Sequence, residues 1–82
     1  MPTVLGFEGL RVAIYPNDHR PAHIHAVGRG CEGVFHLNCP AGPADLWENY
    51  GFSRREIRNI LGVLTNHLDE LCRAWEQIHG IA

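Results

Sequence analysis

The chain has 82 residues and a formal net charge of −2, so it encodes a single domain near the lower size limit for a self-sufficient hydrophobic core. The small negative charge gives no bulk attraction to nucleic acid or to an anionic membrane. The sequence contains no apolar run of about 18 residues and no signal-peptide pattern. Three cysteines without a Cys-x-x-Cys pair therefore predict a cytoplasmic protein with free thiols and no membrane contact.

The first 15 residues alternate between apolar and polar side chains, which predicts a β-hairpin over residues 3–15. A two-residue turn at its centre sets Phe7 opposite Leu10 and collects the large apolar side chains on one face. Arg11 and Tyr15 then point to the opposite face, away from the expected core.

The alternation resumes over residues 22–38 and predicts a second β-hairpin. A tight turn with Gly30 and Cys31 at its centre sets His25 opposite His36 on the outer face of the sheet. The segment between the two hairpins contains two prolines beside Asn-Asp, so it is expected to form a loop.

The last third of the chain predicts one long amphipathic helix over residues 53–79. Ser53 followed by Glu56 is a capping box, and apolar residues then recur with a period near 3.6. Residues 39–52 contain two prolines and are expected to form a linker, with a short helical turn at residues 45–50 that packs on the core.

These elements together predict a single α+β domain over residues 1–82. Its sheet is a four-stranded antiparallel meander formed by residues 1–38, and the long C-terminal helix packs on one face of that sheet. Because such a small domain buries limited surface, a homodimer or a larger protein partner is also considered.

Histidines form the main group of residues with chemical potential. His23 and His25 are two apart on one strand and project from the same face, so they could share a divalent metal with Asp18, His19 or His36. The same imidazoles could act as a general acid–base pair on a phosphodiester or an ester. The alternative is a pair of half-exposed packing residues. The metal candidates are therefore His23, His25 and His36, and the catalytic candidates are Asp18, His19, His23 and His25.

Two surfaces are candidates for binding. The outer face of the sheet presents Arg11, Tyr15 and His36, which suit a protein or RNA partner, although a plain solvated face is an equal alternative. The start of the long helix carries three arginines, which could hold a phosphate or a carboxylate or could simply be solvated. These arginines are Arg54, Arg55 and Arg58.

Several stretches of the chain resemble a family of small bacterial proteins described as domain of unknown function 4160. They are Met-Pro-Thr-Val-Leu at the start, Asn-Asp-His-Arg-Pro-Ala-His-Ile-His over residues 17–25, and Gly-Phe-Ser-Arg-Arg-Glu-Ile over residues 51–57, with His67 and Trp75 downstream. The family usually has a second proline where this chain has Ala22, and a shorter linker before the helix. The resemblance implies a component of a two-gene toxin–antitoxin-type or regulatory module. Its motif falls on Asp18, His19, His23 and His25.

Three functions are therefore considered. The first is a regulatory or toxin–antitoxin-type component that binds a protein partner, which the small size and the lack of a catalytic motif favour. The second is a small His-dependent hydrolase, an RNase-like toxin with or without a divalent metal. The third is a nucleic-acid binder that uses the arginines at the helix start.

Overall fold

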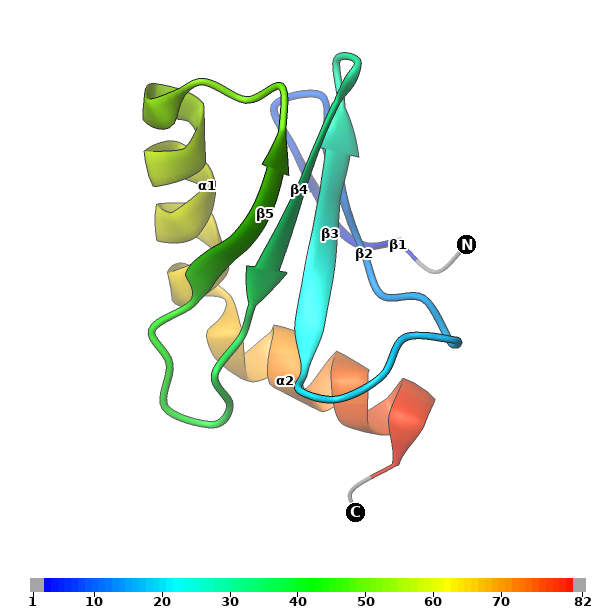
Figure 1. The fold of residues 1–82 in the computed structure, drawn as a ribbon. Helices are drawn as coiled ribbons and strands as arrows, with labels where there is room; N and C mark the ends of the chain where they lie inside the picture. Colours follow the sequence, from blue (N-terminus) through cyan, green and yellow to red (C-terminus); the bar gives the residue numbers. More distant parts are fainter. Residues whose placement is uncertain (1–2, 81–82) are drawn as a thin grey trace.

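The computed structural model describes residues 3–80 and shows an α+β domain in which two helices accompany a five-stranded antiparallel sheet (Figure 1). The strands lie side by side in chain order, so the sheet is a meander as expected. The expected number of four strands and the single long helix are wrong. The elements are β1 (Thr3–Phe7), β2 (Leu10–Ala13), β3 (His23–Gly28), β4 (Cys31–His36), β5 (Asp45–Tyr50), α1 (Arg54–Asn66) and α2 (Leu68–His79).

The first hairpin has the predicted register, with Phe7 opposite Leu10. The second hairpin turns one residue earlier than expected, at Arg29 and Gly30, which both adopt positive φ angles of 52° and 75° as a two-residue hairpin turn requires. The earlier turn sets His36 opposite His23 instead of His25. Because the pairing shifts by two residues, every side chain keeps its predicted face.

The segment expected to contain a helical turn forms strand β5 instead, which pairs antiparallel with β4. Its aromatic residues Trp47 and Tyr50 favour a strand. The register is irregular because Val34 pairs with Glu48 whereas Phe35 pairs with Leu46, which leaves Trp47 as an extra residue. Such a bulge interrupts the alternation of apolar and polar side chains by which a strand is recognised in a sequence, and this explains why a helical turn was expected here.

The predicted helix is divided at His67, whose φ of −114° and ψ of 19° depart from helical values. A straight helix over residues 53–79 would be about 39 Å long at ~1.5 Å per residue. The longest dimension of the domain is 34 Å, so the break lets both segments remain on a compact sheet. The capping box is confirmed, because Glu56 N donates to Ser53 Oγ at 3.1 Å and Ser53 N donates to Glu56 Oε1 at 2.9 Å.

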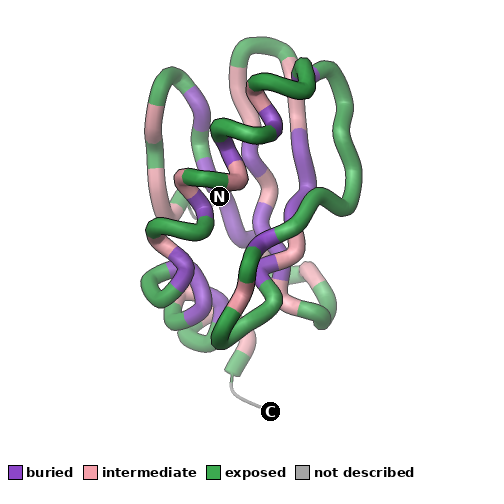
Figure 2. The backbone as a smooth tube through the Cα atoms, turned by 90° about the vertical axis from the view of Figure 1, so that its left-hand side faces the viewer, coloured by how far each residue is buried: buried purple, intermediate pink, exposed green. Residues whose placement is uncertain are grey.

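The core lies between the sheet and the two helices, which cover one face and one end of the sheet (Figures 1 and 2). Both helices contribute buried side chains to it. They are Ile57, Ile60 and Leu64 from α1 and Leu68, Leu71, Cys72 and Trp75 from α2. Within residues 3–80, no helix is both long enough and apolar enough to cross a membrane.

A disulfide bond joins Cys39, just after β4, to Cys72 on α2. The expectation of free thiols is therefore wrong for these two residues, and Cys31 is the free cysteine. The two bonded residues are 33 positions apart, a spacing that carries no sequence signal. The bond ties the linker before β5 to the core helix.

Candidate functional site

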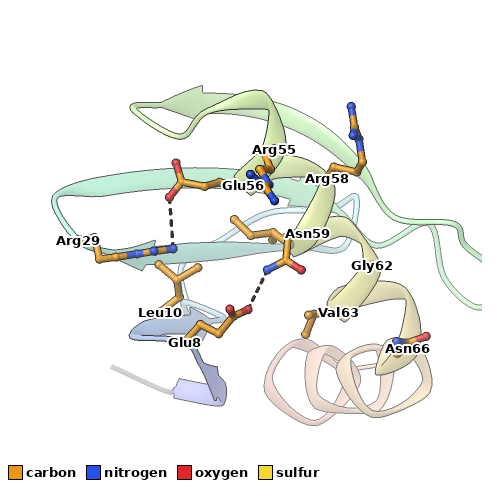
Figure 3. Close-up of a pocket in the computed structure, with 11 residues that line it drawn as sticks. Glu8, Leu10, Arg29, Arg55, Glu56, Arg58, Asn59, Gly62, Val63 and Asn66 are labelled. Carbon is orange, nitrogen blue, oxygen red and sulfur yellow. Dashed lines mark hydrogen bonds and ion pairs between the residues drawn. The ribbon is translucent and has the colours of Figure 1, made fainter.

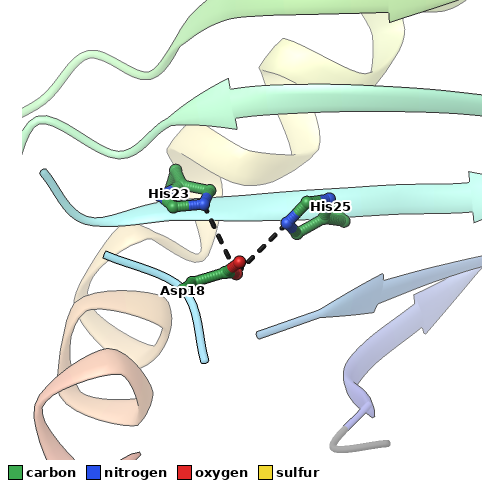
Figure 4. A group of neighbouring side chains, drawn as sticks. All are labelled: Asp18, His23 and His25. Atoms are coloured by element: carbon green, nitrogen blue, oxygen red, sulfur yellow. Dashed lines mark hydrogen bonds and ion pairs between the residues drawn. The ribbon is translucent and has the colours of Figure 1, made fainter. Parts of the chain in front are cut away.

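Three polar side chains converge on the face of the sheet opposite α1: Asp18, His23 and His25 (Figure 4). Strand β3 projects both imidazoles from one face, as the His-x-His spacing predicts. The β2–β3 loop brings the carboxylate over them because Asp18 N donates to Tyr15 O at 3.0 Å and Tyr15 N donates to Asp18 Oδ2 at 3.3 Å. Asp18 Oδ2 lies 3.1 Å from His25 Nε2 and 3.3 Å from His23 Nε2.

The second nitrogen of each ring is also held. His23 Nδ1 lies 2.9 Å from the Pro21 carbonyl oxygen, and His25 Nδ1 lies 3.0 Å from Glu32 Oε2. A carbonyl oxygen only accepts hydrogen bonds, so the proton of the His23 ring sits on Nδ1 and Nε2 is the atom directed at Asp18. Glu32 was not among the predicted site residues, because the expected register paired it with Arg29 at the turn, whereas it lies opposite Val27, two residues along β3.

Aromatic rings enclose this cluster. The His23 ring centroid lies 5.2 Å from that of Trp47 on β5 and 5.4 Å from that of Trp75 on α2. The Tyr15 ring lies 4.6 Å from the His25 ring. His23 is consequently only 5% exposed, so the expected half-exposed outer surface is instead a covered cluster. An enclosed group of this kind can hold an ion, but it does not offer an open cleft for a large substrate.

His36 and His19 do not join the cluster. His36 lies opposite His23 in the sheet, yet its ring stacks on Trp47 at 4.6 Å and its Nδ1 lies 2.9 Å from Asp45 Oδ1. Hydrogen bonds from Asn38 and from His36 hold the pKa of Asp45 below its ordinary value. His19 is exposed on the loop. The structure therefore brings together two of the three metal candidates and replaces His36 with Asp18.

The three arginines at the start of α1 are all exposed, as expected for a binding or solvated surface. Two of them, Arg55 and Arg58, line a hollow between α1 and the β1–β2 turn (Figure 3). The same hollow contains two carboxylates: Glu56 lies 3.3 Å from Arg29, and Glu8 accepts a 2.8 Å hydrogen bond from Asn59. This mixed charge is less suited to a polyanion than an all-basic surface would be.

Strand β5 is the second candidate site, because it forms one edge of the sheet and all six of its residues are exposed (Figure 2). Three of them are large and apolar: Leu46 is 40% exposed, Trp47 49% and Tyr50 58%. The expectation that Leu46 and Trp47 pack on the core is wrong. Large apolar side chains on an unpaired edge are unusual in a monomer, since such an edge invites pairing with another strand.

The register of β5 separates its side chains into two faces. Asp45, Glu48 and Tyr50 pair with residues of β4 that share the face of the histidine cluster. Leu46 pairs with the core residue Phe35 and therefore faces α1. On that side it borders a hollow with an apolar floor and arginines at its rim, lined by Leu46, Asn49, Arg54, Ile57, Arg58 and Leu61.

Comparison with known proteins gives one family and no individual relative. Neither a curated protein nor a solved structure matches the chain. The family model described as "Domain of unknown function (DUF4160)" matches residues 9–76, which include every strand from β2 to β5, the whole of α1 and most of α2. The match covers the histidine cluster and the β5 edge, and on this evidence the chain belongs to the domain of unknown function 4160 family.

Proposed function

We propose that this protein is a small interaction module that binds a partner protein along the free edge of β5. The observation that carries the proposal is an edge strand whose six residues are all exposed and include Leu46, Trp47 and Tyr50. An extended segment of a partner can add to such an edge through backbone hydrogen bonds, while alternate side chains supply specificity. A contact of this kind would serve the regulatory or toxin–antitoxin-type pair that the family resemblance implied.

The two faces of β5 define the chemistry of the partner. The face that carries Asp45, Glu48 and Tyr50 is acidic and aromatic, so it favours Arg or Lys side chains through charge pairing and cation–π contact. The face that carries Leu46 borders the apolar floor formed with Ile57 and Leu61. A strand that alternates basic and apolar residues satisfies both faces at once.

A second copy of this chain is a poorer occupant of the same edge. Antiparallel pairing of two β5 strands would place Asp45 and Glu48 from both copies on one face. Four carboxylates would then lie along a short ribbon with no basic residue of β5 to compensate them. Like charges across paired strands are destabilising, so the homodimer ranks below a basic partner.

Binding of a defined peptide tests the proposal. The probe is a blocked ten-residue peptide of alternating arginine and valine, and its affinity is measured by fluorescence anisotropy. Glu48→Lys should weaken binding at least about tenfold, because it replaces attraction by repulsion beside the docked strand. Glu76→Lys makes the same change in net charge at an exposed position of α2 and should leave the affinity unchanged.

A peptide of alternating arginine and proline has the same charge but cannot pair as a strand, so it serves as the ligand control. The proposal expects this control to bind at least tenfold more weakly than the arginine–valine peptide. Equal binding of the two peptides, or equal effects of Glu48→Lys and Glu76→Lys, would show that the attraction is only general electrostatics.

The cytoplasm is the compartment that we propose for this activity. The Cys39–Cys72 bond would be open to reduction there, because disulfides persist mainly in oxidising compartments. Docking on β5 requires only that the sheet remains folded. The peptide assay is therefore made with and without reductant, and the difference between Glu48→Lys and Glu76→Lys should persist in both conditions.

The two other functions rank lower. Hydrolysis by the histidines is disfavoured because Trp47 and Trp75 cover His23, and a double change of His23 and His25 to alanine tests it through RNA cleavage. Nucleic-acid binding is disfavoured by the carboxylates beside the arginines, and it predicts an affinity that falls steeply with salt.

A further inference from the structure

We infer that Asp18, His23 and His25 form a site for one divalent transition-metal ion of the Zn²⁺ type. Each residue offers one ligand atom, and the three atoms lie within 4.8 Å of one another. Two imidazoles with one carboxylate form a ligand set that suits zinc and other first-row divalent ions. None of the three ligands belongs to β5, although Trp47 of β5 contacts the His23 ring, and the inference does not depend on the proposed docking.

The spacing of the ligand atoms fits a metal. Two atoms that each lie ~2.0–2.1 Å from a tetrahedral ion are about 3.3–3.4 Å apart. Asp18 Oδ2 lies 3.1 Å from His25 Nε2 and 3.3 Å from His23 Nε2, so two of the three distances between ligand atoms are already close to this value. The third distance, between the ligand nitrogens of His23 and His25, is within 4.8 Å, so binding would draw the two rings together by at most about 1.5 Å.

The rings are already oriented as metal ligands are. A histidine that binds a metal through one nitrogen usually donates its other ring N–H to a carbonyl or a carboxylate, which fixes the ring. His23 Nδ1 has the Pro21 carbonyl at 2.9 Å, and His25 Nδ1 has the Glu32 carboxylate at 3.0 Å. Both Nε2 atoms are thereby turned toward Asp18.

Hydrogen bonding alone accounts poorly for this arrangement. A neutral imidazole that donates from Nδ1 has a lone pair at Nε2, so two lone pairs would face one carboxylate oxygen. The side chains of His23 and His25 are only 7% and 15% exposed, so water can do little to compensate these lone pairs. A divalent cation between the three atoms resolves the conflict, and Asp18 and Glu32 balance its charge.

Such an ion would connect two parts of the fold. Asp18 belongs to the β2–β3 loop, whereas both histidines belong to β3, so the ion would hold that loop on the sheet (Figure 4). The His23 ring also contacts Trp47 and Trp75, the two tryptophans of the chain. Intrinsic fluorescence therefore reports directly on the proposed site.

Titration of the protein with Co²⁺ tests the inference, and a Cys31→Ser background removes the free thiol as a competing ligand. Co²⁺ should quench tryptophan fluorescence saturably at one equivalent and give visible absorption bands. Added Zn²⁺ should displace it and restore the fluorescence. Zn²⁺ at ~100-fold excess over its Kd should also raise the Tm by about 10–20 °C, because it binds only the folded chain.

Three variants assign the residues. Asp18→Asn should weaken Zn²⁺ binding by more than ~100-fold, whereas Glu32→Gln, which alters an outer partner, should weaken it ~10–100-fold. His36→Gln is the control, because His36 shares the sheet face and contacts Trp47 but lies outside the cluster. Equal affinity of the Asp18→Asn and wild-type proteins would overturn the assignment. Lack of saturable binding by the wild-type protein would overturn the site itself, whether or not a variant folds.

Discussion

The Cys39–Cys72 bond should contribute a large share of the stability of this domain, and Cys39→Ser is the change that measures it. The bonded residues are 33 positions apart, and closing a loop of that length lowers the entropy of the unfolded chain by about 12.5 cal/mol/K, or about 3.7 kcal/mol at 25 °C. At ~0.05–0.15 kcal/mol per residue, the whole domain has about 4–12 kcal/mol of stability. The Tm should therefore fall by about 15–30 °C.

Urea unfolding followed by tryptophan fluorescence gives the free energy of unfolding of each protein. Cys31→Ser is the matched control, because it removes the free cysteine and should change the free energy by less than about 0.5 kcal/mol. Wild-type protein in reductant should match Cys39→Ser, and a thiol assay on unfolded wild-type protein should find one reactive cysteine. If one thiol is found but Cys39→Ser costs less than ~1 kcal/mol, the loop-entropy reasoning is refuted.

Three further predictions concern local structure in and beside α1. Ser53→Ala should lower the free energy of unfolding by about 0.5–2 kcal/mol in urea unfolding, because it removes the N-cap, and an unchanged value would contradict the cap. Hydrogen bonds from Ser53 lower the pKa of Glu56, so the capping box stabilises the fold above the ordinary carboxyl pKa of 4.5 and loses this effect as the pH falls. Between pH 2 and 7 the Tm of Glu56→Gln should therefore depend less on pH than the Tm of the wild-type protein. An identical pH dependence of the two Tm values would count against this role of Glu56. Gly62→Ala should stabilise the fold by up to about 1 kcal/mol, because Gly62 is an exposed position inside α1 where a Cβ would meet no other atom. Gly51→Ala should destabilise the fold, because Gly51 has a φ of 104° and its Cβ would lie 2.9 Å from Cys31 Sγ. In thermal unfolding the Tm should rise for Gly62→Ala and fall for Gly51→Ala, and a change of the same sign in both variants would contradict the prediction.

Local signals in the sequence predicted the parts of the fold that depend on neighbouring residues. The capping box at Ser53 and the register of Phe7 with Leu10 are set by contacts within a few positions. The common face of His23 and His25 follows from the period of a strand, so two of the three members of the cluster could be placed together from the sequence.

Contacts between distant residues account for what the sequence did not predict. The extra residue Trp47 interrupts the alternation of side chains by which β5 could have been recognised in the sequence. The pairing of Cys39 with Cys72 depends on how α2 packs against the sheet. The covering of His23 by Trp75 spans 52 positions and likewise depends on where the helix breaks. Strand position, ring burial and disulfide pairing are therefore properties of the packed domain.

Amide hydrogen exchange along both edges of the sheet tests the docking of a partner strand most directly. Strand β1 forms the opposite edge and provides an internal control, because its amides experience the same solvent and the same added peptide. With saturating arginine–valine peptide, exchange of the β5 amides that face away from β4 should slow markedly, while exchange in β1 should stay as it is. Slowing confined to β1 or to the start of α1, with β5 unchanged, would contradict the account.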